Sequence, residues 1–219
     1  MTGPVAITPA LLAGLPKSGP TDPIQYYRRP GIGWLFRRRI NLGLGLLENR
    51  RFRRGLEVGY GAGAVLLALA SAVDELHGID LDADPEPVAG LLASRDCSVD
   101  LRRADVRSLP YADDSFDLVV SFSVFEHIQD YGRALAEVER VLEPGGWFLL
   151  GMPAVNRMME AGFHSIGYKR IGAHHVTTPT VVGRSLAASG LSVVRSRNLH
   201  FPLPGIRLYY TWLLTPDRP

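Results

Sequence analysis

Cysteine is almost absent from this chain of 219 residues, in which Cys97 is the single example. One thiol can neither close an intramolecular disulfide nor build a multi-cysteine zinc site. The sequence therefore excludes a disulfide-stapled scaffold. We expect a cytoplasmic protein, because reducing compartments keep thiols free. We also expect no bound metal.

Long apolar runs are missing as well. The longest, residues 62–70, is much shorter than the roughly 20 residues that cross a bilayer. Residues 1–23 contain five prolines and do not show the basic start and apolar stretch of a secretory signal. We therefore expect a soluble protein.

Lysine is scarce, since 22 of the 24 basic residues are arginine, and the net charge of +2 hides an uneven distribution. Residues 1–54 carry ten basic residues and two acids, whereas residues 55–150 carry six and eighteen, and residues 151–219 carry eight and two. Basic flanks can meet nucleic acid, an anionic membrane or an anionic substrate. They can equally be the solvated helix faces of an arginine-rich protein.

Apolar stretches alternate with helical stretches from Gly55 onward, which is typical of a parallel sheet covered by helices on both faces. The expected strands are residues 55–58, 76–79, 99–102, 116–124, 147–152, 191–197 and 206–214. The expected helices are residues 64–72, 85–94, 130–142 and 179–190. We interpret residues 55–219 as one domain and residues 1–54 as an N-terminal extension.

The N-terminal extension divides into two parts. Residues 1–23 are rich in Pro, Gly and Ala without a usable period, so we expect a loose or draped arm. Residues 32–49 have the pattern of one amphipathic helix. Its arginines and apolar residues could make a weak membrane-surface contact through residues 34–49, although packing against the core is the preferred interpretation.

A glycine turn follows the first expected strand, in the run Glu57-Val58-Gly59-Tyr60-Gly61-Ala62-Gly63. Glycines at a strand-to-helix junction let a ligand approach the backbone where a Cβ would collide. Gly59, Gly61 and Ala64 also fit the dinucleotide pattern G-x-G-x-x-(G/A), with Asp80 placed as a ribose partner would be. The turn indicates a nucleoside cofactor without saying which one.

Three further features narrow the choice. The Glu57 carboxylate would repel a pyrophosphate but suits a cofactor with an ammonium and a sulfonium. Asp105 ends the third expected strand, where a carboxylate can accept a hydrogen bond from an adenine amino group. Residues 109–120 lead into the fourth strand, and Phe125-Glu126-His127-Ile128 follows it.

Residues 57–152 thus resemble the class I S-adenosylmethionine-dependent methyltransferases, in particular the methyltransferase type 11 group, and are similar to quinone-biosynthesis C-methyltransferases. The matching runs are residues 56–63, 78–82, 104–127 and 136–151, in family order and spacing. The resemblance implies an α/β, Rossmann-like three-layer sandwich with a seven-stranded, mostly parallel sheet in the order 3-2-1-4-5-7-6, strand 7 being antiparallel. It also implies S-adenosylmethionine as cofactor, S-adenosylhomocysteine as product and a lid helix within residues 1–54.

The resemblance also implies roles for particular residues. Gly59 and Gly61 would pass close to the methionyl part of the cofactor, Asp80 would hold the ribose hydroxyls, and Asp105 with the amide of Val106 would read adenine. The other expected cofactor contacts are Glu57, Tyr60, Gly63, Leu81 and Ser121. Tyr60 departs from the family pattern, in which a small residue is commoner. Glu57, Asp80 and Asp105 also have an ordinary alternative as residues that brace or form turns.

The acceptor side is less clearly marked. His127 follows the fourth strand, where an imidazole could take a proton near neutral pH, but a lone histidine is often structural. We expect acceptor contacts from Tyr27, His164, Tyr168, His174 and His175. Tyr27 could instead pack the arm onto the core. These histidines lack the H-x-x-x-H spacing or cysteine cluster of a metal site.

The resulting hypothesis is methyl transfer to a small, apolar or aromatic metabolite. One alternative is an NAD-dependent oxidoreductase, but the chain has only Lys17 and Lys169 and no Y-x-x-x-K pair. A second is a non-catalytic S-adenosylmethionine-binding protein. No nucleic-acid partner is expected, because residues 121–124 read Ser-Phe-Ser-Val instead of the N-P-P-Y or D-P-P-Y of nucleic-acid methyltransferases. The oligomeric state cannot be read from the sequence.

Overall fold

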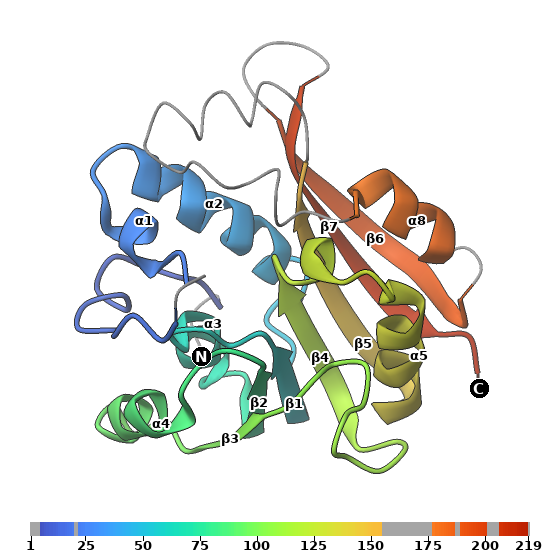
Figure 1. Cartoon of the computed structure of the whole chain (residues 1–219), viewed down its shortest axis with the longest axis horizontal. Helices are drawn as coiled ribbons and strands as arrows, with labels where there is room; N and C mark the ends of the chain where they lie inside the picture. Colours follow the sequence, from blue (N-terminus) through green and yellow to red (C-terminus); the bar gives the residue numbers. More distant parts are fainter. Residues whose placement is uncertain (1–4, 20–21, 155–176, 187–188, 201–205, 219) are drawn as a thin grey trace.

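The computed structural model in Figure 1 describes residues 5–19, 22–154, 177–186, 189–200 and 206–218. Its strands are β1 (Phe52–Val58), β2 (Val73–Asp80), β3 (Val99–Arg103), β4 (Phe116–Phe122), β5 (Leu142–Pro153), β6 (Leu191–His200) and β7 (Arg207–Pro216). In the described part of the chain they form one seven-stranded sheet in the order β3-β2-β1-β4-β5-β7-β6. β7 runs antiparallel to both β5 and β6, and the other neighbours are parallel. The expected sheet is confirmed.

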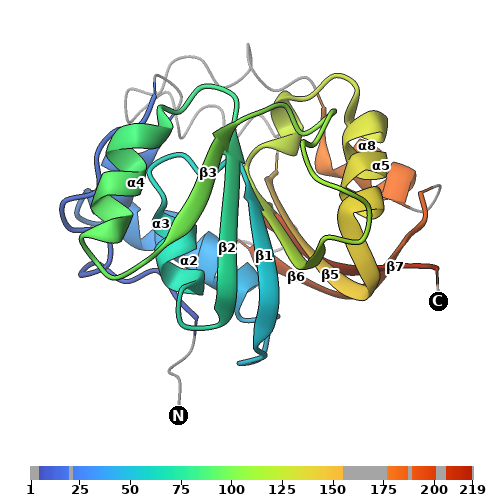
Figure 2. The same ribbon diagram turned by 90° about the horizontal axis from the view of Figure 1, so that it is seen from below.

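The helices lie on the two faces of this sheet. The described residues form α1 (Ile24–Arg28), α2 (Ile32–Leu44), α3 (Ala64–Leu69), α4 (Pro85–Ala93), the single 3-10 turn η1 (Phe125–His127), α5 (Tyr131–Val141) and α8 (Pro179–Leu186). Figure 2 shows α2, α3 and α4 on one side and α5 and α8 on the other. Because side chains alternate along a strand, Leu118 and Val120 of β4 join the core under α1–α4, whereas Val119 joins the core under α5 and α8.

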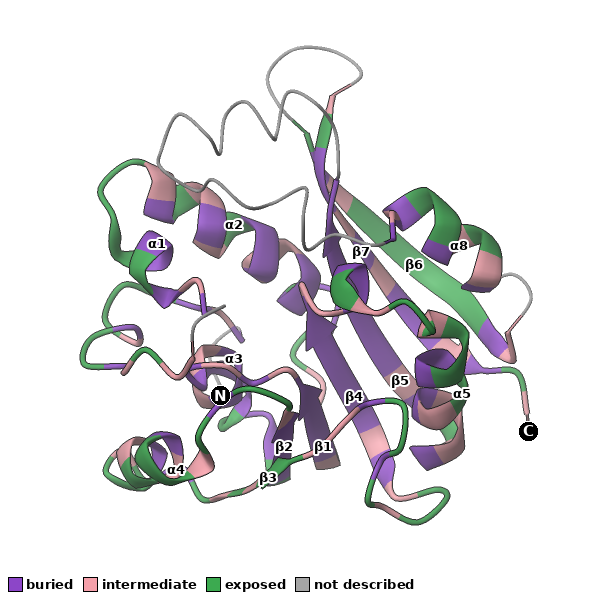
Figure 3. Ribbon diagram, in the orientation of Figure 1, coloured by how far each residue is buried: buried purple, intermediate pink, exposed green. Residues whose placement is uncertain are grey.

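Burial follows the position of each strand in the sheet. Figure 3 shows the central strands β4 and β5 buried along most of their length, whereas the edge strand β6 carries a long exposed stretch. Arg195 and Arg197 lie in that stretch. Charged residues on an edge strand discourage pairing with a second chain.

Of the two expected states of the N-terminal arm, loose or draped, residues 5–19 adopt the draped one. Ile7, Leu12 and Leu15 are at most 2% exposed. The Asn41 side chain of α2 bonds both the N–H and the C=O of Ile7, at 2.7 and 2.9 Å. Arg28 donates to the carbonyls of Leu12 and Leu15. Burial of apolar side chains and side-chain bonds to the arm's carbonyls therefore hold a segment that lacks regular structure.

Element boundaries differ from the expected ones by a few residues. β1 and β2 each begin three residues earlier than expected, and the helix expected to continue to residue 49 ends at Leu44. β4 ends at Phe122 because Ser123 adopts a positive φ of 59°. The expected cap of α5 is confirmed, since the Asp130 carboxylate accepts a hydrogen bond from the Arg133 N–H at 3.2 Å. None of the helices in the described part of the chain has the length and apolarity that crossing a membrane requires.

Candidate cofactor and acceptor site

The glycine turn joins β1 to α3 as expected. Gly59, Gly61 and Gly63 have positive φ values of 80°, 49° and 79°, and Gly63 is the N-cap of α3. A Cβ on Gly59 would lie 2.3 Å from Cγ2 of Val124, which follows β4. The backbone here needs glycine both for its conformation and for this close approach.

Asp80, at the end of β2, stabilises the glycine turn by hydrogen bonds to backbone N–H groups. One of its carboxylate oxygens accepts the Gly61 N–H at 3.0 Å, and the other accepts the N–H groups of Asp82 and Ala83 at 2.9 Å each. The turn-forming role considered from the sequence is therefore present. The carboxylate also lies beside the glycine turn, and its contact with the ribose of a cofactor stays a prediction.

Glu57 is 3% exposed at the tip of β1, and its Oε2 has no hydrogen-bond partner. Burial raises the pKa of this carboxyl well above its ordinary value, and the nearby Asp80 charge raises it further. A cationic ligand would oppose both effects. An orphaned, buried carboxyl oxygen next to a glycine turn therefore fits a cofactor with an ammonium and a sulfonium.

Tyr60 and Ser121 lie beside the turn but inside the packed structure. Tyr60 is 3% exposed, belongs to the core under α1–α4, and lies against Gly78 of β2. Ser121 is fully buried, and its hydroxyl donates to the carbonyl of Val58 across the β1–β4 pair at 3.3 Å. Both side chains shape the walls around the turn, and their contact with a cofactor stays a prediction.

The residues expected to bind adenine follow β2 and β3. Leu81 is 55% exposed, and Val106 is buried. Both carboxylate oxygens of Asp105 accept from Nε of Arg107 at 3.0 Å, and Asp105 Oδ1 also accepts the Arg107 N–H at 2.9 Å. The pKa of Asp105 is lowered, chiefly because Arg107 bonds its carboxylate. An adenine amino group would have to share this carboxylate with Arg107.

Asp22 is a carboxylate at the turn that sequence reasoning did not assign. A Cβ on Gly61 would lie 3.8 Å from Oδ1 of Asp22 and 3.9 Å from Oγ of Ser18. Asp22 is 9% exposed, and its carboxylate accepts from the Ser18 N–H, the Ser18 hydroxyl and the Ile24 N–H at 2.9 to 3.0 Å. The signal in the sequence was that Asp22 is one of only two acids among residues 1–54.

His127, the candidate catalytic base, lies in η1. Its side chain is 44% exposed, and its Nε2 is 3.9 Å from Oε1 of Glu126. Glu126 itself is 1% exposed, and its Oε2 has no hydrogen-bond partner. Burial raises the pKa of Glu126 to about 8, although the charge of Arg39 lowers it. The sequence pattern pointed to the exposed neighbour and missed this buried acid.

Tyr27, the acceptor residue expected from the N-terminal side, is 9% exposed and packs edge-on against Phe36. Its hydroxyl accepts a hydrogen bond from Arg39 at 3.3 Å. The alternative considered from the sequence, packing of Tyr27 against the core, is therefore present, and its contact with an acceptor stays a prediction. His164, Tyr168, His174 and His175 lie outside the described residues. Within the residues that are described, no group of His, Cys, Asp and Glu could hold a metal ion.

Comparison with known proteins shows which families and relatives this chain is similar to. A family model described as a methyltransferase domain matches residues 56–150. The uncharacterized methyltransferase YcgJ of Bacillus subtilis is 36% identical over 113 residues, which are 51% of this chain and 45% of that protein. The ubiquinone biosynthesis O-methyltransferase of Paracidovorax citrulli is 26% identical over 183 residues, which are 78% of this chain and 72% of that protein. The chain thus spans less than half the length of the Bacillus relative.

A solved structure gives the same result for the fold. The N-methyltransferase NodS of Bradyrhizobium japonicum, in complex with S-adenosylhomocysteine, superimposes with a TM-score of 0.66 at 20% identity. The match covers 99% of this chain and 100% of that one. Residues 56–150 are thus similar to the methyltransferase domain family, and the fold is the one seen in NodS.

Proposed function

We propose that this protein transfers the methyl group of S-adenosylmethionine to a small, apolar or aromatic metabolite. One observation carries the proposal: the carboxyls of Glu57, Asp80 and Asp22 surround a glycine turn at the ends of β1 and β2. Carboxyls there favour a cationic adenosyl ligand over a pyrophosphate. The name of the Paracidovorax relative, which concerns ubiquinone biosynthesis, supports an aromatic acceptor.

The residues around the turn have separate roles in this proposal. Glu57 and Asp22 face the ammonium end of the cofactor, Asp80 accepts from the ribose hydroxyls, and Asp105 with the Val106 amide binds adenine. Gly59, Gly61 and Gly63 let the methionyl part approach, while Tyr60, Leu81 and Ser121 shape the walls. The bound cofactor supplies a methyl carbon made electrophilic by the sulfonium. Residues 1–54 act as the lid over residues 55–219.

The test of this function is a methyl-transfer screen. The purified protein is incubated with isotope-labelled S-adenosylmethionine and a small-molecule extract of bacterial cells, and labelled products are sought by mass spectrometry. We expect a labelled apolar or aromatic compound, with contacts to Tyr27, His164, Tyr168, His174 and His175 as its proposed binding set. Binding of S-adenosylhomocysteine without any labelled product would indicate a non-catalytic binding protein.

His127 gives a first prediction. Replacing His127 by Ala should leave the affinity for S-adenosylhomocysteine unchanged, because the imidazole is 44% exposed and is not among the expected cofactor contacts. If His127 removes the acceptor's proton, turnover should fall by about 10² to 10⁴. Calorimetry measures the first quantity and the screened reaction the second. Unchanged turnover with the acceptor would assign His127 a structural role only.

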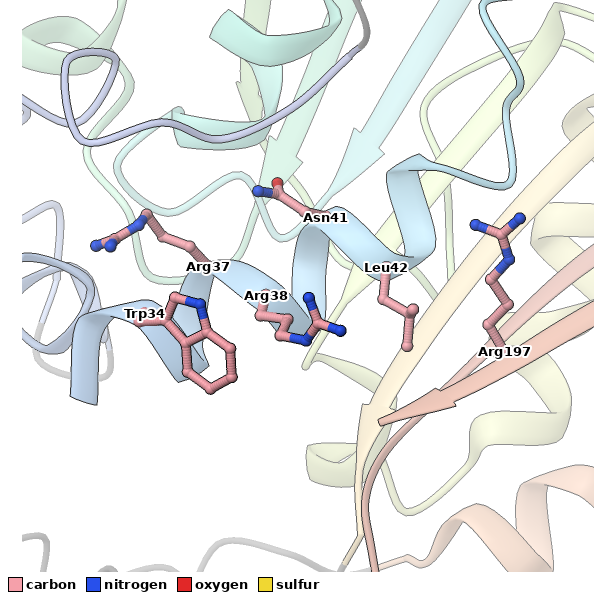
Figure 4. A pocket seen from close by; sticks show the side chains of 6 residues that line it. All are labelled: Trp34, Arg37, Arg38, Asn41, Leu42 and Arg197. Atoms are coloured by element: carbon pink, nitrogen blue, oxygen red, sulfur yellow. The ribbon is translucent and has the colours of Figure 1, made fainter. Parts of the chain in front are cut away.

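We also propose a weak contact of α2 with anionic membrane surfaces. The apolar residues Phe36, Ile40 and Leu44 face the core, so the helix cannot insert its apolar face into lipid. Its outer face instead forms a pocket of about 310 Å³, shown in Figure 4 and lined by Trp34, Arg37, Arg38, Asn41, Leu42 and Arg197. Trp34 is 58% exposed, and the Arg38 guanidinium lies 5.5 Å from its ring centre. Three arginines and an indole without an acid suit an anionic headgroup layer.

Sedimentation with lipid vesicles tests this contact. The protein should bind phosphatidylglycerol vesicles, should not bind phosphatidylcholine vesicles, and should be released by salt. The double variant R38Q/R197Q should bind about 30-fold more weakly, since each basic residue near such a surface contributes about 1 kcal/mol. R51Q is the control, because Arg51 is also exposed but pairs with Asp74, outside this pocket. If R38Q/R197Q and R51Q bind the vesicles equally well, Arg38 and Arg197 do not contact the membrane and the proposal is contradicted.

A further inference from the structure

Four buried polar side chains lie around the loop that follows β4. Arg39 of α2, Glu126 of η1, Tyr209 of β7 and Tyr27 of α1 are each at most 9% exposed. The Arg39 guanidinium lies over the ring of Tyr209 at 5.3 Å and donates to the Tyr27 hydroxyl at 3.3 Å. The Tyr209 hydroxyl in turn is 2.9 Å from the hydroxyl of Ser123. We refer to Arg39, Glu126, Tyr209 and Tyr27 as the buried polar cluster.

The cluster is not internally satisfied. Glu126 Oε2 and Arg39 Nε each have no hydrogen-bond partner, and the two charged groups form no ion pair within 4 Å in the described part of the chain. Leaving buried polar atoms unpaired costs free energy, so such atoms call for an explanation. If Arg39 and Glu126 formed a structural ion pair, the guanidinium would bond the carboxylate directly. Two unpaired groups of opposite charge instead suit a polar group that binds between them.

The cluster is joined to the cofactor site by one short loop. Val124 lies against Gly59, its neighbour Ser123 contacts Tyr209, and Glu126 follows two residues later. The carbonyl of Glu126 accepts a hydrogen bond from the N–H of Thr177 at 3.3 Å. The loop after β4 therefore has the glycine turn on one side and Arg39 with Tyr209 on the other. A methyl acceptor must lie next to the cofactor in the same region.

We propose that Glu126 takes the proton from a hydroxyl group of the methyl acceptor, and that Arg39 and Tyr209 hold the acceptor's oxygen. This inference rests on the proposed function. In the step, the O–H proton moves to the Glu126 carboxylate and an oxygen lone pair forms the bond to the methyl carbon. The carbon–sulfur bond breaks with its electron pair on sulfur, which gives a methyl ether and S-adenosylhomocysteine. Glu126 then releases the proton to water.

The charges around the site favour a hydroxyl over an amine. Arg39 is a permanent cation, which stabilises the negative charge that develops on an oxygen and repels a protonated amine. The titratable and charged groups near Glu126 among the described residues are Arg39 from α2, Tyr209 from β7, Tyr27 from α1 and His127 from η1 itself. Phe36 and the tyrosine rings supply apolar surface for a ring that carries the hydroxyl.

The titration of Glu126 predicts a pH profile. With a pKa near 8, the carboxyl is protonated at neutral pH, and its ionised fraction rises about tenfold per pH unit below that value. Turnover should therefore increase with pH up to about 8 and then level off. A base with an ordinary carboxyl pKa would give a flat profile over the same range.

The experiment compares wild type with E126Q and the control E86Q in the labelled-cofactor reaction with a bacterial small-molecule extract. Glu86 is an exposed residue of α4, outside the cluster. We expect a label on oxygen, a rate reduced by about 10² to 10⁴ in E126Q, and loss of the pH dependence. E86Q should behave as wild type. A label on nitrogen or carbon, or an E126Q variant with the wild-type rate and pH profile, would overturn the proposal.

Two measurements without turnover separate this proposal from the proposed function. S-adenosylhomocysteine should bind wild type and E126Q equally by calorimetry. If wild type does not bind it, or binds it but labels no compound, the proposed function fails; if wild type labels a compound and E126Q labels the same compound at the same rate with the same pH profile, only the role of Glu126 fails. Thermal unfolding is the second readout. Because the folded protein keeps a proton that the unfolded chain loses above about pH 4.5, Glu126 lowers stability as pH rises toward 8, and E126Q should show a smaller decline.

Discussion

Replacing Gly59 by alanine should reduce the affinity for S-adenosylhomocysteine by about 100-fold or more, because a shift of about 1 Å in a binding site can have an effect of this size. The φ of 80° at Gly59 costs an L-residue roughly 1–2 kcal/mol. The new Cβ would also lie 2.3 Å from Val124 Cγ2. The turn or the loop after β4 must therefore move, and both border the proposed site. Calorimetric titration measures the affinity.

Gly90 provides the matched control for this substitution. It lies in α4, and a Cβ there would have no atom within 4 Å. Replacing Gly90 by alanine should leave the affinity unchanged and stabilise the protein by about 1 kcal/mol, since alanine favours a helix interior. If G59A and G90A bind S-adenosylhomocysteine equally well, the glycine turn does not contact the cofactor.

Replacing Asp80 by alanine should weaken binding of S-adenosylhomocysteine by about 10² to 10⁴, since hydrogen bonds to a charged group contribute about 1.5–3 kcal/mol each and two ribose hydroxyls would lose theirs. The same change leaves the N–H groups of Gly61, Asp82 and Ala83 without their acceptor. Thermal unfolding should therefore show a lower midpoint in parallel with the loss of affinity. The two measurements together distinguish a cofactor contact from a turn brace.

Two further variants make this prediction decisive. D80N keeps one carbonyl oxygen for the turn and should fold better than D80A while still binding the ribose weakly. D82A removes an exposed carboxylate two residues away and should bind as wild type. A D80A protein that is destabilised but binds S-adenosylhomocysteine with wild-type affinity would show that Asp80 acts only within the turn.

Much of the fold could be predicted from local patterns. Alternating apolar stretches identified the strands, and the glycine run identified the junction of β1 with α3, because both depend on residues close in sequence. The early start of β1 could not be seen in this way. The N–H groups of Arg53 and Arg54 donate to the Asp117 carboxylate at 2.7 and 2.9 Å, and this long-range contact extends a strand through two charged residues.

For a similar reason the sequence could not decide between a loose and a draped arm. Residues 5–19 have no hydrophobic period, so nothing local indicated burial. Their order depends on Arg28, Asn41 and Arg95, each of which bonds backbone groups of the arm. Apolar side chains without a period can still be buried when side chains from elsewhere satisfy the backbone.

The same distinction applies to the candidate site. The glycine turn and Asp80 belong to local motifs, and the sequence placed them correctly beside each other. The buried polar cluster joins residues from α1, α2, η1 and β7, which are up to 182 positions apart along the chain. Only the fold brings Arg39 and Tyr209 to Glu126. From the sequence, the familiar titration range of histidine drew attention to His127 instead.

The central claim is that a carboxyl-lined site at the ends of β1 and β2 binds an adenosyl sulfonium. Calorimetric titration of the purified protein with S-adenosylmethionine, S-adenosylhomocysteine and NADH tests it directly. We predict saturable one-to-one binding of the two adenosyl ligands and no binding of NADH. Binding of NADH, or no binding of either adenosyl ligand, would contradict the account.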